Sequence, residues 1–182
     1  ANELFKPLAS PSSHPVIRLA LVGIWQKPKN PLLLVEALAK LRPEEVDRFD
    51  ITWIGEGPEM AAVRSLVKEK GWRNIKFLGM QPKAVVAETL RQADYLVHPT
   101  DAENLPCIII ESLASGTPVV SMRVNGIPEL VDASNGVLID AKDVDQLTTV
   151  LRSIQSGDHH FDRLEISRRA AARFSAAAIG AQ

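Results

Sequence analysis

Short apolar runs alternate with amphipathic stretches along most of the chain, from Val16 to Ile154. The runs carry few polar interruptions, which is typical of parallel strands buried on both faces. They predict strands at 16–22, 50–55, 74–78, 94–98, 117–121 and 136–139. The stretches between them place apolar residues at helical spacing, so each predicts a helix that buries one side.

Several of the predicted helices have recognisable ends. Asn30-Pro31 predicts an N-cap followed by proline at the first helical position. Asp143 predicts another N-cap, with Gln146 three residues later. The remaining boundaries are Pro58 and Gly71, then Val85 to Leu90, then Pro106 to Gly116. Strict strand and helix alternation indicates right-handed βαβ units, and therefore an α/β fold with a Rossmann-like, doubly wound parallel sheet.

The two ends of the chain differ from this pattern. Residues 1–15 contain three prolines and three serines without a period, which predicts an interdomain linker. Residues 16–157 then form the Rossmann-like domain, and 158–182 form a C-terminal segment with a helix at about 161–178. Arg163 and Arg173 project close to the apolar stripe of that helix. We expect a solvated arginine-rich helix, with docking on something outside this chain as the alternative.

Composition bounds the possible functions. The chain has 182 residues, 46% of them hydrophobic and 24% charged, and a net charge of −1, which indicates a globular domain. No run of like charges suggests a nucleic-acid surface or a polybasic membrane patch. Cys107 is the only cysteine, which excludes an internal disulfide and favours a reducing compartment. Because no apolar run could span a bilayer or serve as a signal peptide, we expect a cytoplasmic protein without a transmembrane segment.

Glu111 is the strongest local anomaly, because it interrupts the apolar run from Cys107 to Ala114. A helix that is apolar around most of its circumference is packed on several sides, and an ionised carboxylate there needs partners. The functional interpretation is a carboxylate that accepts two hydrogen bonds from a vicinal diol. The structural alternative is a pairing with a backbone amide or a nearby cation.

Glu103 lies eight residues earlier, in the segment 98–106 between a predicted strand and a predicted helix. Ligands of doubly wound sheets bind at this carboxyl end of the strands. The free amides at the start of the helix can there meet a sugar or a phosphate. Two carboxylates could also be the acid and nucleophile of a glycosidase, a less favoured interpretation because one lies on a helix behind the loop that bears the other. For Glu103 alone, an exposed loop acid is the simplest alternative.

The loop 23–31 after the first strand combines Gly23 with Lys27 and Lys29. A lysine beside free helix amides can bind phosphate oxygens, although the loop lacks the glycine spacing of a P-loop and solvated lysines are the alternative. Gly55-Glu56-Gly57 is interpreted as a structural turn, and His98 as a packed histidine rather than a base. No metal-ligand spacing is present.

Together, in order, these segments resemble the C-terminal, donor-binding domain of retaining group 1 glycosyltransferases. Enzymes of this family have two Rossmann-like domains, the GT-B architecture, and a signature of two glutamates separated by seven residues. The matching segments are Gly23 with 29–31, 54–58, 77–79, 93–94, 99–100, Glu103 to Glu111 with 112–120 after it, 126–129 and 135–136. The resemblance covers about residues 2–179, including an entering segment at 2–7 and a final helix that looks like a return crossing.

The resemblance implies a role for each matching residue. Glu111 would hold the ribose hydroxyls of a nucleotide-diphosphate sugar, and Glu103 would contact the donor sugar together with the amides around Asn104 and Leu105. Lys29, in the loop that Gly23 opens, would neutralise the diphosphate. The segment with Phe77, Gly79, Met80 and Gln81 would border the base. No cofactor and no obligatory metal are expected, because basic groups and amides stabilise the leaving diphosphate.

Two positions depart from the family pattern. Ile24 stands where the family has an arginine that contacts the diphosphate, and Lys27 could compensate. Asn104 stands where the family has glycine, and asparagine tolerates the left-handed conformation better than most residues.

The sequence therefore predicts the donor-binding half of a glycosyltransferase that moves a hexose to an acceptor hydroxyl in polysaccharide or glycoconjugate synthesis. Its partners would be the nucleotide sugar and a missing N-terminal acceptor domain, and the full-length protein could touch a membrane peripherally. Two alternatives remain: one half of a sugar-nucleotide epimerase, and a binding module that has lost turnover.

Overall fold

The computed structural model describes residues 4–7, 16–103 and 106–174. Six strands form one sheet in the order β3-β2-β1-β4-β5-β6, and every adjacent pair is parallel. The strands are β1 (Ile17–Val22), β2 (Phe49–Ile54), β3 (Ile75–Gly79), β4 (Tyr95–His98), β5 (Val119–Met122) and β6 (Gly136–Ile139). Each predicted strand is confirmed, with its bounds within two residues of the observed ones.

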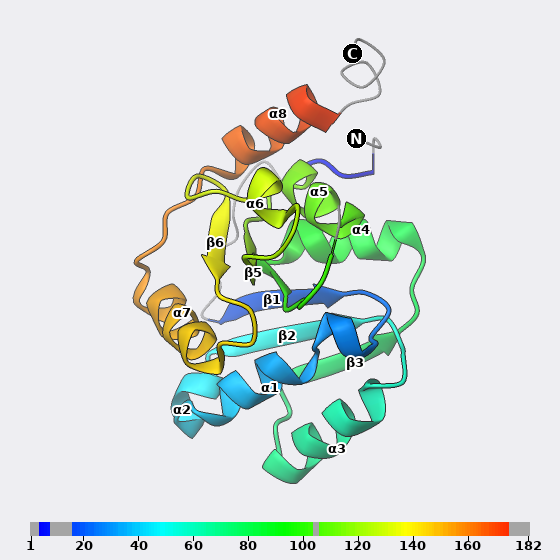
Figure 1. The fold of residues 1–182 in the computed structure, drawn as a ribbon, viewed down its shortest axis with the longest axis vertical. Coiled ribbons are helices and arrows are strands. Elements are labelled where there is room, and N and C mark those ends of the chain that lie inside the picture. Colours follow the sequence, from blue (N-terminus) through cyan, green and yellow to red (C-terminus); the bar gives the residue numbers. More distant parts are fainter. Residues whose placement is uncertain (1–3, 8–15, 104–105, 175–182) are drawn as a thin grey trace.

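Helices cover both faces of the sheet, as Figure 1 shows. One face carries α1 (Leu32–Ala39), α2 (Pro43–Val46), α3 (Met60–Lys70) and α7 (Val144–Ser156). The other carries α4 (Lys83–Gln92), α5 (Cys107–Ala114), α6 (Ile127–Leu130) and α8 (Arg163–Phe174). A short 3-10 turn, η1 (Lys27–Lys29), precedes α1. The predicted doubly wound α/β fold is therefore confirmed. In the described part of the chain, no helix is long and apolar enough to cross a bilayer.

The buried strands explain why their sequences read as continuous apolar runs. In β1, Leu19 and Leu21 pack into the cluster under α1, whereas Ala20 between them packs into the cluster under α4 and α5. Successive side chains of a strand point to opposite faces, and here both faces are covered. Burying one leucine contributes about 1.5–3 kcal/mol, so these two clusters supply the main stabilisation of the sheet.

The strand order reverses between β1 and β4. The chain after β1 enters α1 on one face, whereas the chain after β4 enters α5 on the other. The two connecting segments, 23–31 and 99–106, therefore part at this point. In doubly wound sheets such a switch point is where ligands bind.

The N-cap predicted for Asn30 is wrong. Pro31 occupies the cap position of α1, and the Asn30 amide instead donates to Asp101 Oδ1 at 3.2 Å. Asn30 has a left-handed backbone with φ 40°, whereas an N-cap residue is usually extended. The N-cap predicted for Asp143 is confirmed, because its carboxylate accepts from the Gln146 amide at 2.8 Å.

The expectation of a solvated C-terminal helix is also wrong. Ile166 and Ala170 of α8 are buried, and the helix lies along α5 of the same chain (Figure 1). Arg163 stands at the buried side because its guanidinium donates to the carbonyls of Ala93 and Arg91, at 2.7 and 2.9 Å. The arginine near the apolar stripe thus helps to dock the helix. Residues 175–178 of the predicted helix, and 1–3 and 8–15 of the predicted linker, lie outside the described residues.

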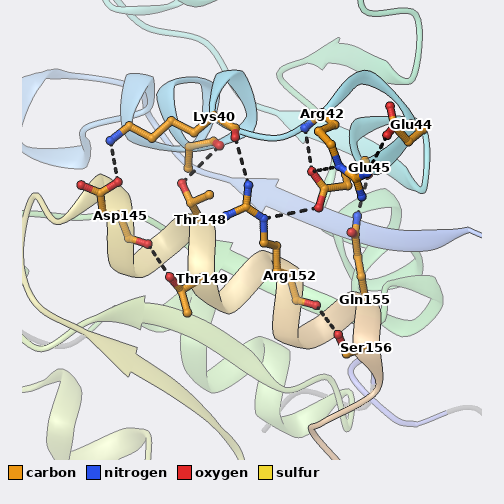
Figure 2. Close-up of polar contacts among 11 residues, drawn as sticks. Lys40, Arg42, Glu44, Glu45, Asp145, Thr148, Thr149, Arg152, Gln155 and Ser156 are labelled. Carbon is orange, nitrogen blue, oxygen red and sulfur yellow. Dashed lines mark hydrogen bonds and ion pairs between the residues drawn. The ribbon is translucent and has the colours of Figure 1, made fainter.

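Polar contacts fasten α7 to α1 and α2, in what we call the α1–α7 seam (Figure 2). It comprises contacts of residues 37–45 with residues 145–155. Arg152 pairs with Glu45 at 3.3 Å, and Gln155 donates to the Glu45 carbonyl at 2.6 Å. Near the other end, Lys40 pairs with Asp145 at 2.6 Å, and the buried Thr148 hydroxyl lies 3.3 Å from the Ala37 carbonyl. The helices that the seam joins also bury apolar side chains in the cluster that packs against one face of β1.

Candidate functional site

Hydrogen bonds of backbone and side-chain groups join the two loops that diverge at the switch point. The Asp101 amide donates to the Pro28 carbonyl at 2.8 Å, and the Thr100 hydroxyl lies 3.1 Å from the same oxygen. The Asn30 side chain reaches Asp101 from the other loop. These contacts bring together two segments about 70 residues apart in the sequence. The side chains that the loops carry can therefore meet over the carboxyl ends of β1 and β4.

Lys29 and Glu103 form an ion pair across this junction. Their side chains are 21% and 20% exposed, so the pair is largely removed from water but open on one side. Burial lowers the pKa of the Lys29 ammonium. The structure thus places two of the residues predicted from the sequence in direct contact, with both charges compensated.

His98, the last residue of β4, lies next to this pair on its buried side and is 2% exposed. Its Nε2 is 3.7 Å from Glu103 Oε2, which is too long for a hydrogen bond. Neither ring nitrogen has a hydrogen-bond partner among the described residues. Burial, with a further contribution from the Lys29 charge, lowers the pKa of His98 to about 3, so the imidazole is neutral at physiological pH. The sequence interpretation of a packed histidine is confirmed.

Glu111 lies in the second turn of α5 and is half-buried. Its carboxylate accepts no hydrogen bond from the described residues. Burial raises the pKa of this carboxyl group, and the positive charge of Lys83 at the start of α4 opposes the rise. The structural alternative, a close pairing with an amide or a cation, therefore finds no hydrogen-bonded partner in the described part of the chain.

The end of β3 carries the four residues predicted to border a base. Phe77 is half-buried, and its ring is covered by the Arg64 guanidinium at 4.5 Å. Gly79 has φ 66°, a left-handed conformation that favours glycine. Met80 is 65% exposed, whereas the Gln81 amide turns back to donate to the Leu78 carbonyl at 2.6 Å. Met80 is the one of these four whose side chain offers a large apolar surface to solvent.

Glycines let the loops after β1 and β2 pack against each other. Gly55 has φ 108°, and a Cβ at this position would lie 1.8 Å from the Gly23 carbonyl oxygen. A Cβ on Gly57 would lie 2.1 Å from the Trp25 carbonyl oxygen. Residues 55–57 thus have a structural role, as predicted, but it is close packing of two loops, and the turn itself lies at 58–59. The Gly23 amide donates to the Ile54 carbonyl at 3.2 Å, so this amide is already used within the protein.

Trp25 is a residue that sequence reasoning missed. It is fully buried although its neighbours Ile24 and Gln26 in the loop 23–31 are exposed, and its indole Nε1 donates to the Ile54 carbonyl at 3.0 Å. The available signal was a large aromatic residue two positions after a strand-end glycine. Trp25 fixes the path of the loop that carries Lys27, which is exposed, and Lys29.

The remaining predicted positions stand as follows. Ile24, in place of the family arginine, is 61% exposed. Asn104 and Leu105 lie outside the described residues. Within 4–7, 16–103 and 106–174, no three metal-ligating side chains gather where they could hold an ion. The expectation that no metal is required stays a prediction.

Comparison with known proteins identifies the class of protein to which this fold belongs. The family model for group 1 glycosyl transferases matches residues 17–156, and the chain belongs to this family. The D-inositol 3-phosphate glycosyltransferase of Corynebacterium kroppenstedtii is 30% identical over 148 residues, which are 77% of this chain and 33% of that protein. The N-acetyl-alpha-D-glucosaminyl L-malate synthase of Bacillus anthracis is 32% identical over 124 residues, 67% of this chain and 32% of that protein. The chain thus spans about a third of the length of these relatives.

Solved structures agree with this assignment at the level of the fold. HepE of Anabaena, in complex with UDP and glucose, has a TM-score of 0.81 at 22% identity, over 98% of this chain and 52% of that one. The C-terminal domain of the group 1 glycosyl transferase LpcC from Francisella tularensis has a TM-score of 0.73 at 22% identity, over 92% of each chain. The expected resemblance to a C-terminal domain of GT-B architecture is confirmed.

Proposed function

We propose that this domain binds the nucleotide-diphosphate-sugar donor of a retaining glycosyltransferase that moves a hexose to an acceptor hydroxyl. The observation that carries the proposal is the half-buried Glu111 carboxylate, which accepts no hydrogen bond from the described residues. A vicinal diol would supply two donors to it at once. Family membership supports the proposal, as does a structural neighbour whose complex contains UDP-glucose.

Four groups of residues each bind a different part of the donor. Glu111 holds the ribose diol, and the segment 77–81 borders the base. Lys29 meets the diphosphate, in front of the free amides at the start of α5, which favour negative charge. Glu103 contacts the donor sugar. Electrostatic stabilisation of the charge that develops on the leaving diphosphate is the main catalytic contribution of this domain.

The acceptor would come from a second domain. The matched relatives are about three times longer than the region that this chain aligns with. Positioning an acceptor hydroxyl at the anomeric carbon in a water-poor cleft can supply about 7–11 kcal/mol of a barrier. The 182-residue chain should therefore bind donor and transfer nothing, and binding should need no metal.

Donor binding is tested by titration calorimetry of this chain with UDP-glucose, GDP-mannose and ADP-glucose, each with and without EDTA. We expect one nucleotide to bind clearly better than the others, with the same affinity in EDTA. Failure of all three to bind would contradict the proposal.

Turnover is tested on the full-length protein that contains this domain. Transfer to an acceptor, with the anomeric configuration of the product read by NMR, supports a retaining transferase. Release of an isomerised sugar would instead support the epimerase alternative. Glu103→Ala serves as the control against contaminating activity.

One observation favours the alternative of a binding module without turnover, namely the exposed apolar side chain of Ile24 in the phosphate-facing loop. Ile24→Arg should strengthen UDP binding, because a guanidinium can bond two phosphate oxygens. Leu164→Arg on α8, which is equally exposed at 61%, adds the same charge elsewhere and is the matched control. An Ile24→Arg protein that is folded but gains no more than the control would favour a remodelled phosphate site.

A further inference from the structure

His98, Lys29 and Glu103 form a cluster in which one member has no partner. Glu103 Oε2 lies in an ion pair with Lys29 and 3.7 Å from His98 Nε2. The two His98 ring nitrogens find no hydrogen bond among the described residues, although the side chain is nearly fully buried. A buried polar group left unpaired costs about 1–3 kcal/mol, so its presence calls for an explanation.

Donor binding would change which group compensates the charge of Glu103. The inference rests on the proposed function, in which Lys29 faces the donor diphosphate. A diphosphate carries more negative charge than one carboxylate, and bound there it would draw the Lys29 ammonium away from Glu103. The Glu103 side chain is only 20% exposed, so water alone compensates poorly for the lost ion pair. The His98 imidazole has no hydrogen-bond partner among the described residues, and its Nε2 lies 3.7 Å from the Glu103 carboxylate.

We propose that His98 is a positioning residue for Glu103. When Lys29 turns to the donor diphosphate, the His98 Nε2–H donates a hydrogen bond to the Glu103 carboxylate. This bond holds Glu103 against the donor sugar. A shift of less than 1 Å would bring the 3.7 Å separation of Nε2 and Oε2 to hydrogen-bond length. The ring is well placed to act as a fixed donor. It stands at the end of a buried strand, and the Ser121 hydroxyl on β5 donates to the His98 carbonyl at 2.8 Å.

The protonation of His98 fits this role. Burial and the charge of Lys29 lower its pKa to about 3, so the ring is neutral and carries one N–H. A neutral donor can bond the carboxylate without cancelling its charge. Glu103 then remains an acceptor for sugar hydroxyls after Lys29 has left.

The test compares a nucleotide sugar with the nucleotide alone, because only the sugar contacts Glu103. The 182-residue chain is titrated with UDP-glucose and UDP, or with GDP-mannose and GDP or ADP-glucose and ADP, whichever pair the wild type binds. His98→Leu should weaken binding of the sugar nucleotide about tenfold, the loss expected for a hydrogen bond to a charged group. The free nucleotide also draws Lys29 away from Glu103 but brings no sugar for Glu103 to hold, so its affinity should fall less, by about threefold at most.

Two further variants separate positioning from simple support of the fold. His98→Gln retains an amide donor and should restore most of the sugar-dependent affinity. Ser121→Ala removes the hydroxyl bond to the His98 carbonyl, which keeps its bond from the Thr100 amide, and leaves the ring, so any change should be the same for both ligands. Equal loss of both ligands in His98→Leu, or no loss, overturns the positioning role. If the wild type binds no pair, the donor-binding proposal itself fails.

A second measurement remains informative if His98→Leu does not fold. In chain labelled with ¹⁵N-histidine, Lys29→Met frees Glu103 without any ligand. We expect the His98 signal, assigned by its loss in His98→Gln, to show a slowly exchanging Nε2–H in Lys29→Met. The signal should revert in the Lys29→Met/Glu103→Ala double variant. An Nδ1–H tautomer in Lys29→Met, or the same spectrum in both variants, overturns the proposal.

Discussion

The α1–α7 seam and the switch-point site are both built from charged and polar side chains, but they differ in how those groups are partnered. In the seam, Glu45 is bonded by Arg152 and through its carbonyl by Gln155, and the buried Thr148 hydroxyl has two carbonyl neighbours. In the site, Glu111 accepts no hydrogen bond and His98 has none at either nitrogen, within the described residues. The same kinds of groups have hydrogen-bond or ion-pair partners in the seam and lack hydrogen-bond partners in the site.

The difference separates polar groups that serve folding from those that serve binding. Contacts in the seam are complete once the helices have docked, and no ligand can improve them. In the site, unpaired buried groups cost stability in the free protein, and a ligand with matching donors recovers that cost on binding. Substitutions in the two regions should therefore move different observables.

The largest effect should come from Gly55→Ala, because it disrupts the close packing of the loops after β1 and β2, which positions the site. The new Cβ would lie 1.8 Å from the Gly23 carbonyl, on a backbone with φ 108°. We expect a loss of about 3 kcal/mol or more in the free energy of unfolding, measured by urea titration, together with loss of UDP-glucose binding. Gly71→Ala is the matched control. Gly71 also has a positive φ of 69° but nothing within 4 Å of a Cβ, so its cost should be about 1 kcal/mol of backbone strain. Equal costs at the two positions would contradict the packing argument.

Next in size is Glu111→Gln, which should change binding and leave folding intact. Loss of a charge-assisted contact to the ribose diol should weaken UDP-glucose binding by about 1.5–3 kcal/mol, measured by calorimetry. Because burial raises the pKa of this carboxyl group, the charged form is disfavoured in the folded state, and glutamine should not lower the free energy of unfolding at pH 7. Glu69→Gln, at an exposed position of α3, controls for the change of net charge. Unchanged affinity in Glu111→Gln would favour the structural interpretation of this residue.

The third prediction concerns pH and His98. The pKa of His98 is about 3 in the folded protein and about 6.5 in the unfolded chain, so the unfolded state binds more protons between these values. The stabilisation due to a neutral His98 is complete above pH 6.5 and is lost as the pH falls through this window. At pH 5.0 the loss should be about 2 kcal/mol, at 1.36 kcal/mol per pH unit.

Urea titrations at pH 7.5 and 5.0 measure this effect. His98→Gln cannot titrate, and the other acidic groups respond alike in both proteins. The wild type should therefore lose about 2 kcal/mol more than His98→Gln between the two pH values. Parallel losses would mean that His98 is not held neutral by the fold.

The sequence predicted the features that depend on local patterns. Apolar runs predicted all six strands, because a strand buried on both faces is apolar at nearly every position. The alternation of these runs with helices predicted that the strands are parallel. The switch-point loops followed from topology, and the isolated charge of Glu111 followed from its apolar surroundings. The roles assigned to Glu103, Glu111 and Lys29 stay predictions.

Features that depend on contacts between distant segments could not be predicted. Asn30 looked like an N-cap, but its partner Asp101 lies 71 residues away. Arg163 looked solvated, but its guanidinium meets carbonyls about 70 residues away, at the end of α4. The contact of Lys29 with Glu103, and the buried histidine below it, likewise arise only when β1 and β4 become neighbours.

The smallest effect should come from the seam. Thr148→Val keeps the shape of the buried side chain and removes a hydroxyl that lies 2.8 Å from the Val144 carbonyl and 3.3 Å from the Ala37 carbonyl. Neither carbonyl is left without a donor, since the Lys40 amide also bonds the Ala37 oxygen and the Val144 oxygen lies within a helix. The cost should be about 1 kcal/mol in the free energy of unfolding. Thr149→Val, one residue further on the same helix, removes a similar hydroxyl bond from an exposed position that does not touch α1, and should cost less. Because the seam is complete without ligand, neither variant should change the affinity for UDP-glucose. A binding defect in Thr148→Val without one in Thr149→Val would show that the seam and the site are coupled, and would remove the distinction between them.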